Sequence, residues 1–104
     1  MTAAVKTPSV VLKREIVLDT ITGTPVRVTE YYIEVTKATQ SDWILLETAI
    51  GDTSKTLVGA TGIVLDSSAD LTQETLTYDD SDDKLILGGA GVGTSKLTIR
   101  MKNA

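Results

Sequence analysis

Residues 96–102 read Lys-Leu-Thr-Ile-Arg-Met-Lys, with apolar side chains at positions 97, 99 and 101 and polar side chains between them. This alternation has the two-residue period that places successive side chains on opposite faces of a β-strand. One face would enter a core and the other would meet solvent. The stretch therefore predicts a half-buried strand, and similar patterns recur along the chain.

Further strands are predicted on both sides of this one. Apolar side chains at positions 10, 12, 16 and 18 predict a strand that leads into a turn at residues 20–24. The next strand, residues 26–37, changes the phase of its apolar positions near Thr29 and Glu30, so we expect a β-bulge there. Four more short strands are predicted, at residues 56–58, 63–66, 71–78 and 84–87.

Residues 42–50 fit two kinds of structure. Apolar side chains at positions 43, 46 and 50 form a helical stripe, with Ser41 as N-cap and Gly51 just after the helix. Residues 43–46 also fit a buried strand. We favour the strand because the neighbouring sequence is β-rich and the stretch is short for a helix, and the helix stays as the alternative.

The composition indicates an all-β fold. Of the 104 residues, 35 are Val, Ile or Thr, the β-branched types that favour strands. About eight short strands predict a single-domain β-sandwich or small barrel over residues 10–104. Residues 1–9 are small and polar, and we expect them to form an extended N-terminal arm that is either flexible or binds a partner.

The chain contains no cysteine and no histidine. This excludes disulfides, thiolate nucleophiles, thiolate zinc sites and the commonest general base. The formal net charge of −4 argues against a nucleic-acid partner, because such binding depends on clustered Lys and Arg. No segment approaches the roughly 18 apolar residues of a membrane span, and residues 1–9 lack a signal-peptide core. We expect a protein made in a cytoplasm, without a cofactor and without a membrane or nucleic-acid partner.

One stretch offers a catalytic alternative. Residues 63–70 read Ile-Val-Leu-Asp-Ser-Ser-Ala-Asp, which resembles the apolar-apolar-Asp-Ser/Thr-Gly-Ala signature of retroviral-type aspartic proteases. The resemblance implies a dimer in which two copies of Asp66 share a proton, one acting as base and the other as acid. Ser68 stands where that family has glycine, and Asp66 falls past mid-chain. We therefore expect a strand end and a turn here, with the protease-like dimer as an alternative.

Two loops contain residue types found in ligand sites. Four aspartates lie close together, at Asp79, Asp80, Asp82 and Asp83. Their oxygens suit Ca²⁺, but Lys84 occupies the place of the EF-hand glycine, so a solvated hairpin loop is expected and calcium binding stays open. Residues 88–96 contain the glycines of a phosphate loop, yet Thr94 and Ser95 come between Gly93 and Lys96, so we expect a flexible inter-strand loop.

The aromatic side chains suggest one more alternative. There are four of them, at Tyr31, Tyr32, Trp43 and Tyr78. Gathered on one face, they would stack on sugars, as in a β-sandwich carbohydrate-binding module. Their assignment to the core and its edge is the simpler interpretation.

As a whole, the chain resembles small head decoration and minor capsid structural proteins of tailed phages and related archaeal viruses. The resemblance rests on the arm at residues 1–9, the Thr/Val/Gly-rich body, the glycine loop at residues 88–93, and the lack of Cys and His. It implies a β-sandwich or β-tulip-like domain that reinforces the outer capsid surface of a virion. Its partners would be the major capsid protein and further copies of itself, as a homotrimer, with no catalysis. The partner-binding residues are then predicted to be Thr2, Ala3, Ala4, Val5, Lys6, Thr7, Pro8 and Ser9.

Overall fold

A computed structural model describes residues 2–19, 23, 25–51, 54–66 and 71–103. These residues form eight strands and one short helix. In chain order the elements are β1 (Ser9–Asp19), β2 (Pro25–Thr36), β3 (Trp43–Leu45), α1 (Leu46–Ile50), β4 (Thr56–Asp66), β5 (Leu71–Gln73), β6 (Leu76–Asp79), β7 (Lys84–Leu87) and β8 (Gly93–Lys102).

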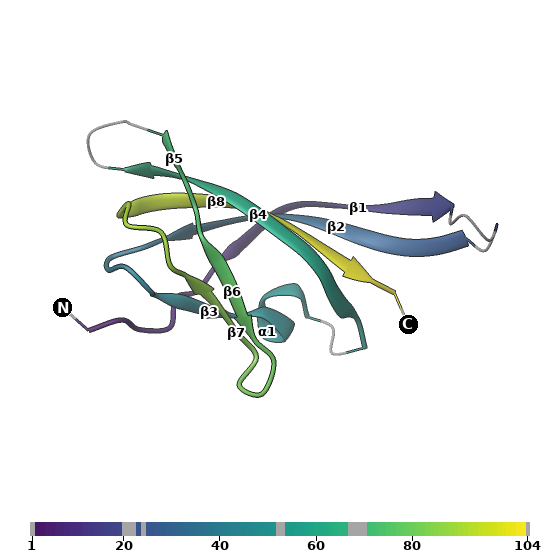
Figure 1. Ribbon diagram of the computed structural model, residues 1–104, viewed down its shortest axis with the longest axis horizontal. Coiled ribbons are helices and arrows are strands. Elements are labelled where there is room, and N and C mark those ends of the chain that lie inside the picture. The colour runs from purple at the N-terminus through teal and green to yellow at the C-terminus, as the bar shows by residue number, and fades with distance from the viewer. Residues whose placement is uncertain (1, 20–22, 24, 52–53, 67–70, 104) are drawn as a thin grey trace.

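The strands make two antiparallel sheets. The larger has the order β1-β2-β8-β4-β5, and the smaller has the order β3-β7-β6. Figure 1 shows the small sheet and α1 lying against one face of the large sheet. The all-β prediction is confirmed, and the two separate sheets correspond to a sandwich-like arrangement.

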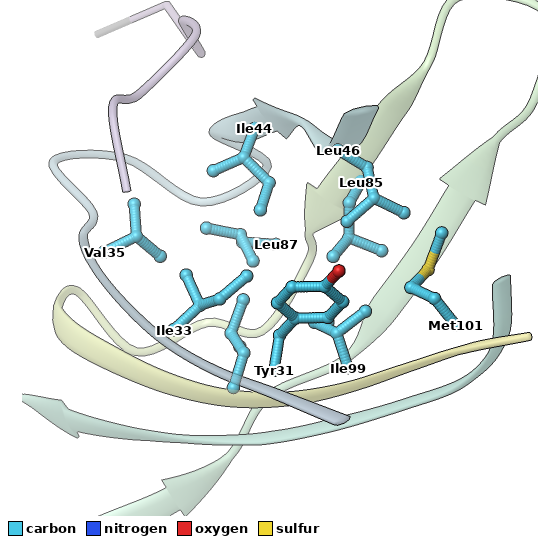
Figure 2. Close-up of a cluster of buried hydrophobic side chains, with 10 residues drawn as sticks. Tyr31, Ile33, Val35, Ile44, Leu46, Leu85, Leu87, Ile99 and Met101 are labelled. Carbon is cyan, nitrogen blue, oxygen red and sulfur yellow. The ribbon is translucent and has the colours of Figure 1, made fainter. Parts of the chain in front are cut away.

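The core lies between these two sheets. Every second residue of segments 31–35 of β2 and 97–101 of β8 points into it, which confirms the pattern seen in residues 96–102 (Figure 2). The buried apolar side chains are Tyr31, Ile33 and Val35 from β2, Leu97, Ile99 and Met101 from β8, Ile44 from β3, Leu46 from α1, and Leu85 and Leu87 from β7. Burial of each such side chain stabilises the fold by roughly 1.5–3 kcal/mol before opposing entropy is counted.

The bulge expected in β2 is wrong. β2 keeps continuous register with β8 and adds no residue of its own opposite β1, and the shifts lie instead at Val11 in β1 and at Val58 in β4. The apolar positions change phase because β2 is buried on both faces near its middle. Val28, on the face away from the core, is only 1% exposed. The phase change of the apolar positions in β2 is therefore explained without an inserted residue.

Residues 42–50 contain both of the structures that the sequence allowed. A three-residue strand, β3, passes directly into the five-residue helix α1. Gly51 ends the helix with φ of 73°, as expected, but Ser41 is not its N-cap. The helix begins after Leu45, and its first turn is held by Asp83, whose carboxylate accepts hydrogen bonds from the backbone N–H of Glu47 at 3.0 and 3.1 Å.

Two predicted strand boundaries are also corrected. The segments at residues 56–58 and 63–66 belong to one continuous strand, β4. Gly62 does not break it. A Cβ at this position would lie 2.5 Å from Leu97 Cδ2, so glycine permits close packing of β4 on β8. The predicted turn at residues 20–24 lies outside the described residues except for Gly23, which has φ of 80°.

The predicted strand at residues 71–78 is two strands in different layers. β5 pairs with β4 in the large sheet, whereas β6 pairs with β7 in the small one. Glu74 and Thr75 form the step between them, and Figure 1 shows the chain descending from one sheet to the other here. This step is one of the joints that hold the two sheets together.

The large sheet extends beyond the small one. The molecule measures 47 × 28 × 21 Å, and the β1–β2 hairpin projects past the region that the small sheet covers (Figure 1). The β2–β8 ladder starts at Val28, so residues 25–27 of β2 have only β1 as a strand partner, and beyond the ladder Asn103 N–H donates to the Arg27 carbonyl at 2.9 Å. Within the described residues, no helix is long and apolar enough to cross a membrane.

Candidate functional site

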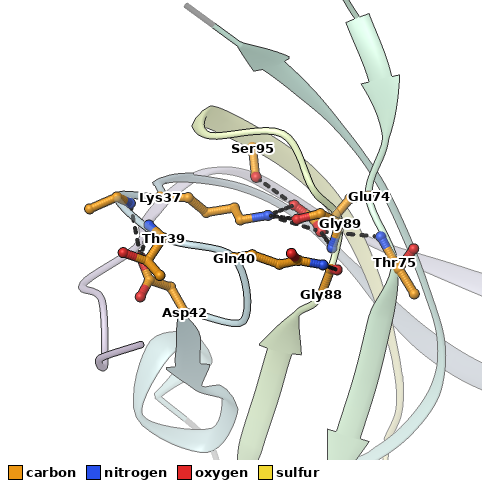
Figure 3. Close-up of polar contacts among 10 residues, drawn as sticks. Lys37, Thr39, Gln40, Asp42, Glu74, Thr75, Gly88, Gly89 and Ser95 are labelled. Atoms are coloured by element: carbon orange, nitrogen blue, oxygen red, sulfur yellow. Dashed lines mark hydrogen bonds and ion pairs between the residues drawn. The ribbon is translucent and has the colours of Figure 1, made fainter. Parts of the chain in front are cut away.

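The most buried ionisable groups form an ion pair at the joint between the sheets. Lys37 and Glu74 both have fully buried side chains, and Lys37 Nζ lies 3.1 and 3.3 Å from the two oxygens of Glu74 (Figure 3). Lys37 Nζ also donates to the carbonyl of Gly89 at 2.7 Å. Glu74 accepts from the N–H groups of Gly89 at 2.7 Å and Thr75 at 3.1 Å, and from Ser95 Oγ at 2.9 Å. Every polar atom of the pair is occupied inside the protein.

These contacts also account for the glycine loop. Gly88 N–H donates to the carbonyl of Thr75 at 2.7 Å, and a Cβ on Gly89 would lie 2.7 Å from a Glu74 oxygen. Residues 88–92 do connect two strands, as expected. Their close contacts with the step between β5 and β6 explain the glycines, and the Gly89 N–H is not available to a phosphate.

Asp42 fixes the loop before β3 and the N-terminal arm. Its carboxylate accepts from the backbone N–H of Ala4, Ala38 and Thr39 at 2.8 to 3.0 Å, and Lys6 Nζ lies 3.9 Å away. Burial acts to raise the pKa of Asp42. The three N–H donors and the lysine outweigh it and hold the pKa below its usual value.

Glu30 occupies the centre of the other face of the large sheet. It accepts hydrogen bonds from Arg14 Nε at 3.1 Å, from Arg100 Nε at 2.9 Å and from the Tyr32 hydroxyl. Arg14, Glu30 and Arg100 lie directly opposite one another on β1, β2 and β8. The Tyr32 hydrogen bond, opposed by desolvation and reinforced by the two arginines, lowers the pKa of Glu30. The cluster ties three strands together.

The acidic loop serves its own turn and the neighbouring helix. Asp79 accepts from the backbone N–H and hydroxyl of Ser81, and Asp83 accepts from Glu47 N–H and, at 2.8 Å, from the Tyr78 hydroxyl. Burial and the bond to Asp83 raise the pKa of Tyr78. In the part of the chain that the structure describes, no three acidic side chains converge on a metal position. The calcium hypothesis gains no geometric support there.

The protease hypothesis rests largely outside the described residues. Asp66 is the last residue of β4, and its backbone lies opposite Gly93. The side chain of Asp66 and residues 67–70, which include Ser68, are not among the described parts. The hypothesis therefore stays a prediction from sequence.

The four aromatic side chains do not form one platform. Tyr31 is buried in the core, and Tyr32, its neighbour, points to the opposite face of β2. Trp43 lies on the small sheet with Lys84 Nζ 4.4 Å from its ring centre, and Tyr78 is bonded to Asp83. An open groove of about 510 Å³ on the outer face of the large sheet is lined by Tyr32 and by no other aromatic residue within the described ranges. The described residues therefore do not gather the aromatic side chains on one face, as the sugar-binding alternative assumed.

The N-terminal arm lies beside β3 of its own chain. Val5 forms a parallel bridge with Trp43, where Lys6 N–H donates to the Trp43 carbonyl at 2.8 Å and Trp43 N–H donates to Ala4 at 3.2 Å. The Val5 side chain is nevertheless 52% exposed. The backbone of the arm is thus partly used within the chain, while side chains such as Val5 remain available to a partner.

The second accessible surface is the outer edge of β1, which we call the β1 edge (Ser9–Asp19). β1 is the first strand of the large sheet, and among the described strands it pairs on one side only, with β2. Exposed apolar side chains lie along it: Val10, Leu12 and Val17 are 41%, 57% and 53% exposed. A long strand with one free side is able to bind another strand through its backbone.

Sequence patterns did not identify the β1 edge or the Lys37–Glu74 pair as special features. The sequence did contain a signal for the β1 edge, because residues 9–19 include six apolar side chains, which is many for a strand at a solvent-exposed edge. The signal for the second was absent, since a lone lysine and a lone glutamate 37 residues apart carry no periodicity. Comparisons with protein-family models, with curated proteins and with solved structures find no match to this chain.

Proposed function

We propose that this chain is a non-enzymatic structural protein that binds and reinforces a larger protein assembly. The assembly is the outer capsid surface of a virion, where the chain is a decoration protein that contacts the major capsid protein and further copies of itself. The observation that carries the proposal is the placement of accessible apolar side chains on two extended elements, the N-terminal arm and the β1 edge.

The buried charges support a structural role. Glu30, Lys37, Asp42 and Glu74 are each almost fully buried, and each is bonded to groups of the protein itself. Catalytic acids and bases instead present at least one atom to a substrate. Within the described residues, no buried side-chain nitrogen or oxygen is left without a partner. These groups are arranged to hold strands and layers in place.

The arm and the β1 edge are suited to binding proteins. Within the described residues, β1 has no strand on its outer side, and the arm is joined to β3 by the bridge between Val5 and Trp43. Backbone at a sheet edge pairs with a strand of another protein. Val5 and Leu12 add exposed apolar surface to each. A protein present in many copies on a particle would use such elements to bridge its neighbours.

The proposal is tested by finding where the chain occurs. Particles from a culture that carries the gene are banded on a density gradient, and their proteins are quantified by mass spectrometry. We expect the chain in the particle band at a copy number within about tenfold of the major capsid protein. A chain found only outside the particle band would contradict the proposal.

The role of the arm is tested by adding purified protein back to particles stripped of it. Val5→Asp places a charge on the exposed arm side chain but leaves the backbone bonds to Trp43, and it should abolish rebinding. Thr77→Asp adds the same charge on β6, at the opposite side of the small sheet, and should rebind normally. Equal rebinding of the two variants would remove the arm from the contact.

A further inference from the structure

We propose that two copies of this chain pair along their β1 edges, in antiparallel fashion, about a twofold axis that passes through Arg14. The two five-stranded sheets would then join into one continuous sheet. This inference goes beyond the function proposed above and does not depend on a virion, because it concerns the purified chain alone. It proposes a dimer in place of the homotrimer that the capsid resemblance implies.

The β1 edge is free to accept a strand. β1 is eleven residues long and has no neighbouring strand on its outer side within the described residues. Its far half belongs to the hairpin that projects past the small sheet (Figure 1), so neither α1 nor the small sheet stands in front of it there. A second strand would satisfy backbone groups that otherwise face water.

The sequence of β1 is chemically symmetric about Arg14. It reads Ser-Val-Val-Leu-Lys-Arg-Glu-Ile-Val-Leu-Asp, with apolar residues on both sides of the central Lys13-Arg14-Glu15. In an antiparallel pair centred on Arg14, Leu12 of one copy lies opposite Ile16 of the other, and Lys13 lies opposite Glu15. Apolar residues thus meet apolar residues, and opposite charges meet twice.

Neighbouring registers lack this complementarity. Centring the pair on Lys13 places two lysines opposite each other and sets Leu12 against Arg14. Centring it on Glu15 places two carboxylates together and sets Lys13 against Val17. Directly opposite side chains on one face contact each other, and like charges there are destabilising, so the register at Arg14 is the favoured one.

The faces of the sheet agree with this pairing. Lys13 and Glu15 lie opposite Tyr31 and Thr29 of β2, so both project from the same face of the sheet. Leu12 lies opposite Tyr32 and projects from the other face, where it is 57% exposed. The pairing would cover Leu12 with the apolar side chain of Ile16 from the second copy.

Arg14 is the one like-charged contact, and the structure reduces its cost. Arg14 Nε already donates to the buried carboxylate of Glu30 at 3.1 Å. Each guanidinium on the axis therefore has an anionic partner within its own chain. Glu15 is similarly placed to serve two cations, since Arg27 Nη1 lies 2.7 Å from it and Lys13 of the second copy would approach from the other side.

Charges in an edge strand often have the opposite purpose, which is to prevent pairing. An edge strand whose charges all have the same sign repels any other copy of the chain that approaches it. Here Lys13 and Glu15 have opposite signs at positions that exchange across a twofold axis, so they attract. The symmetry of the pattern is what distinguishes a self-pairing edge from a guarded one.

The oligomeric state of the purified chain tests the inference. Sedimentation velocity of the wild-type protein should show a dimer that dissociates on dilution. Lys13→Glu turns two attractive contacts into two repulsive ones and should raise the dissociation constant about tenfold or more. The double variant Lys13→Glu/Glu15→Lys exchanges the charges and should restore dimerisation.

The controls separate this pairing from general charge effects and from damage to the fold. Lys96→Glu makes the same change in net charge on β8, away from the β1 edge, and should dimerise like wild type, with circular dichroism confirming the fold of each variant. Damage to the fold would accumulate in the double variant, whereas rescue requires contacts between copies. A wild-type monomer or trimer, or a dimer indifferent to Lys13→Glu, would overturn the inference.

The register has its own test, because the chain contains no cysteine. Under oxidising conditions, an equal mixture of the Leu12→Cys and Ile16→Cys variants should form disulfide-linked dimers. Either variant alone should not, since residue 12 of one copy lies about four residues, roughly 13 Å, from residue 12 of the other. Efficient cross-linking of Leu12→Cys alone would contradict pairing about Arg14.

Discussion

Removing the charge of one member of the Lys37–Glu74 pair should destabilise the protein severely. Removing both charges together should cost less than the two single changes added. The side chains of both residues are fully buried, so neither charge is able to reach water when its partner is lost. Breaking a buried ion pair in this way costs about 3–5 kcal/mol. A domain of this size has a total stability of only about 5–15 kcal/mol, so each single change is severe.

The structure allows the two single variants to be ranked. Lys37→Met leaves Glu74 with three neutral donors, the N–H groups of Gly89 and Thr75 and the hydroxyl of Ser95, so we expect a loss near about 3 kcal/mol. Glu74→Gln leaves the buried ammonium of Lys37 without an anion, and the loss should be closer to about 5 kcal/mol.

The double variant Lys37→Met/Glu74→Gln contains no unpaired buried charge. The introduced glutamine is still able to accept a hydrogen bond from Gly89, and the introduced methionine fills much of the space of the lysine. We expect the loss of stability in the double variant to be no greater than that of Lys37→Met. The coupling energy is then at least as large as the loss expected for Glu74→Gln alone, about 5 kcal/mol.

These losses can be measured by urea unfolding at pH 7, followed by circular dichroism and by the fluorescence of the single tryptophan, Trp43. A loss of about 3 kcal/mol should lower the melting temperature by roughly 12 °C or more. Lys96→Met removes the exposed pair with Glu34, whose atoms are 3.6 Å apart, and should change stability by less than about 1 kcal/mol. Additive effects of the two buried changes, or single losses as small as that of the control, would refute the reasoning.

Three further changes follow from other contacts. Gly62→Ala forces a Cβ to 2.5 Å from Leu97 Cδ2 and should lower the free energy of unfolding in urea by about 1–3 kcal/mol. At Gly59 a Cβ would have nothing within 4 Å, so Gly59→Ala should be nearly neutral. Equal effects of the two variants would exclude close packing as the cause. Asp42 has a lowered pKa, so its contribution to stability is complete above its ordinary pKa of 3.8 and is lost as pH falls through the lower folded value. Asp42→Asn should be less stable at pH 7 but lose less on acidification from pH 5 to pH 2, and parallel pH profiles for the two proteins would contradict this. Asp83→Ala removes the hydrogen-bond acceptor at the first turn of α1 and should lower the stability by about 1–2 kcal/mol. Thermal unfolding measures this loss, and an unchanged melting temperature would contradict it.

The sequence was sufficient for the strands that bury one face. Alternation identified β8 and β7, because in these strands the two faces meet different surroundings. It failed in the middle of β2, where Val28 is buried on the face away from the core and the period-two pattern loses its meaning. It also predicted two strands, at residues 56–58 and 63–66, where the structure has only β4. The sequence does not distinguish a glycine needed for close packing, such as Gly62, from a glycine in a turn.

The step between β5 and β6 at Glu74 could not be predicted from the sequence either, and the reason is different. The apolar positions change phase between Leu71 and Leu76, but a phase change alone does not indicate that the chain moves to another sheet. The step is fixed by Lys37 and by the loop at Gly89, which are distant in sequence. The same holds for the candidate interaction surfaces: whether residues 9–19 form an edge or a central strand depends on which strand lies beside them.

The position of β8 has a consequence for how the protein is made. β8 is synthesised after the other seven described strands, yet it lies in the middle of the large sheet, between β2 and β4. Until it emerges from the ribosome, β2 and β4 each have an unpaired side, and the core lacks Leu97, Ile99 and Met101. The nascent chain therefore has two incomplete half-sheets that are prone to associate, and its burial of apolar surface is completed late and through contacts between distant residues, which are slow to form.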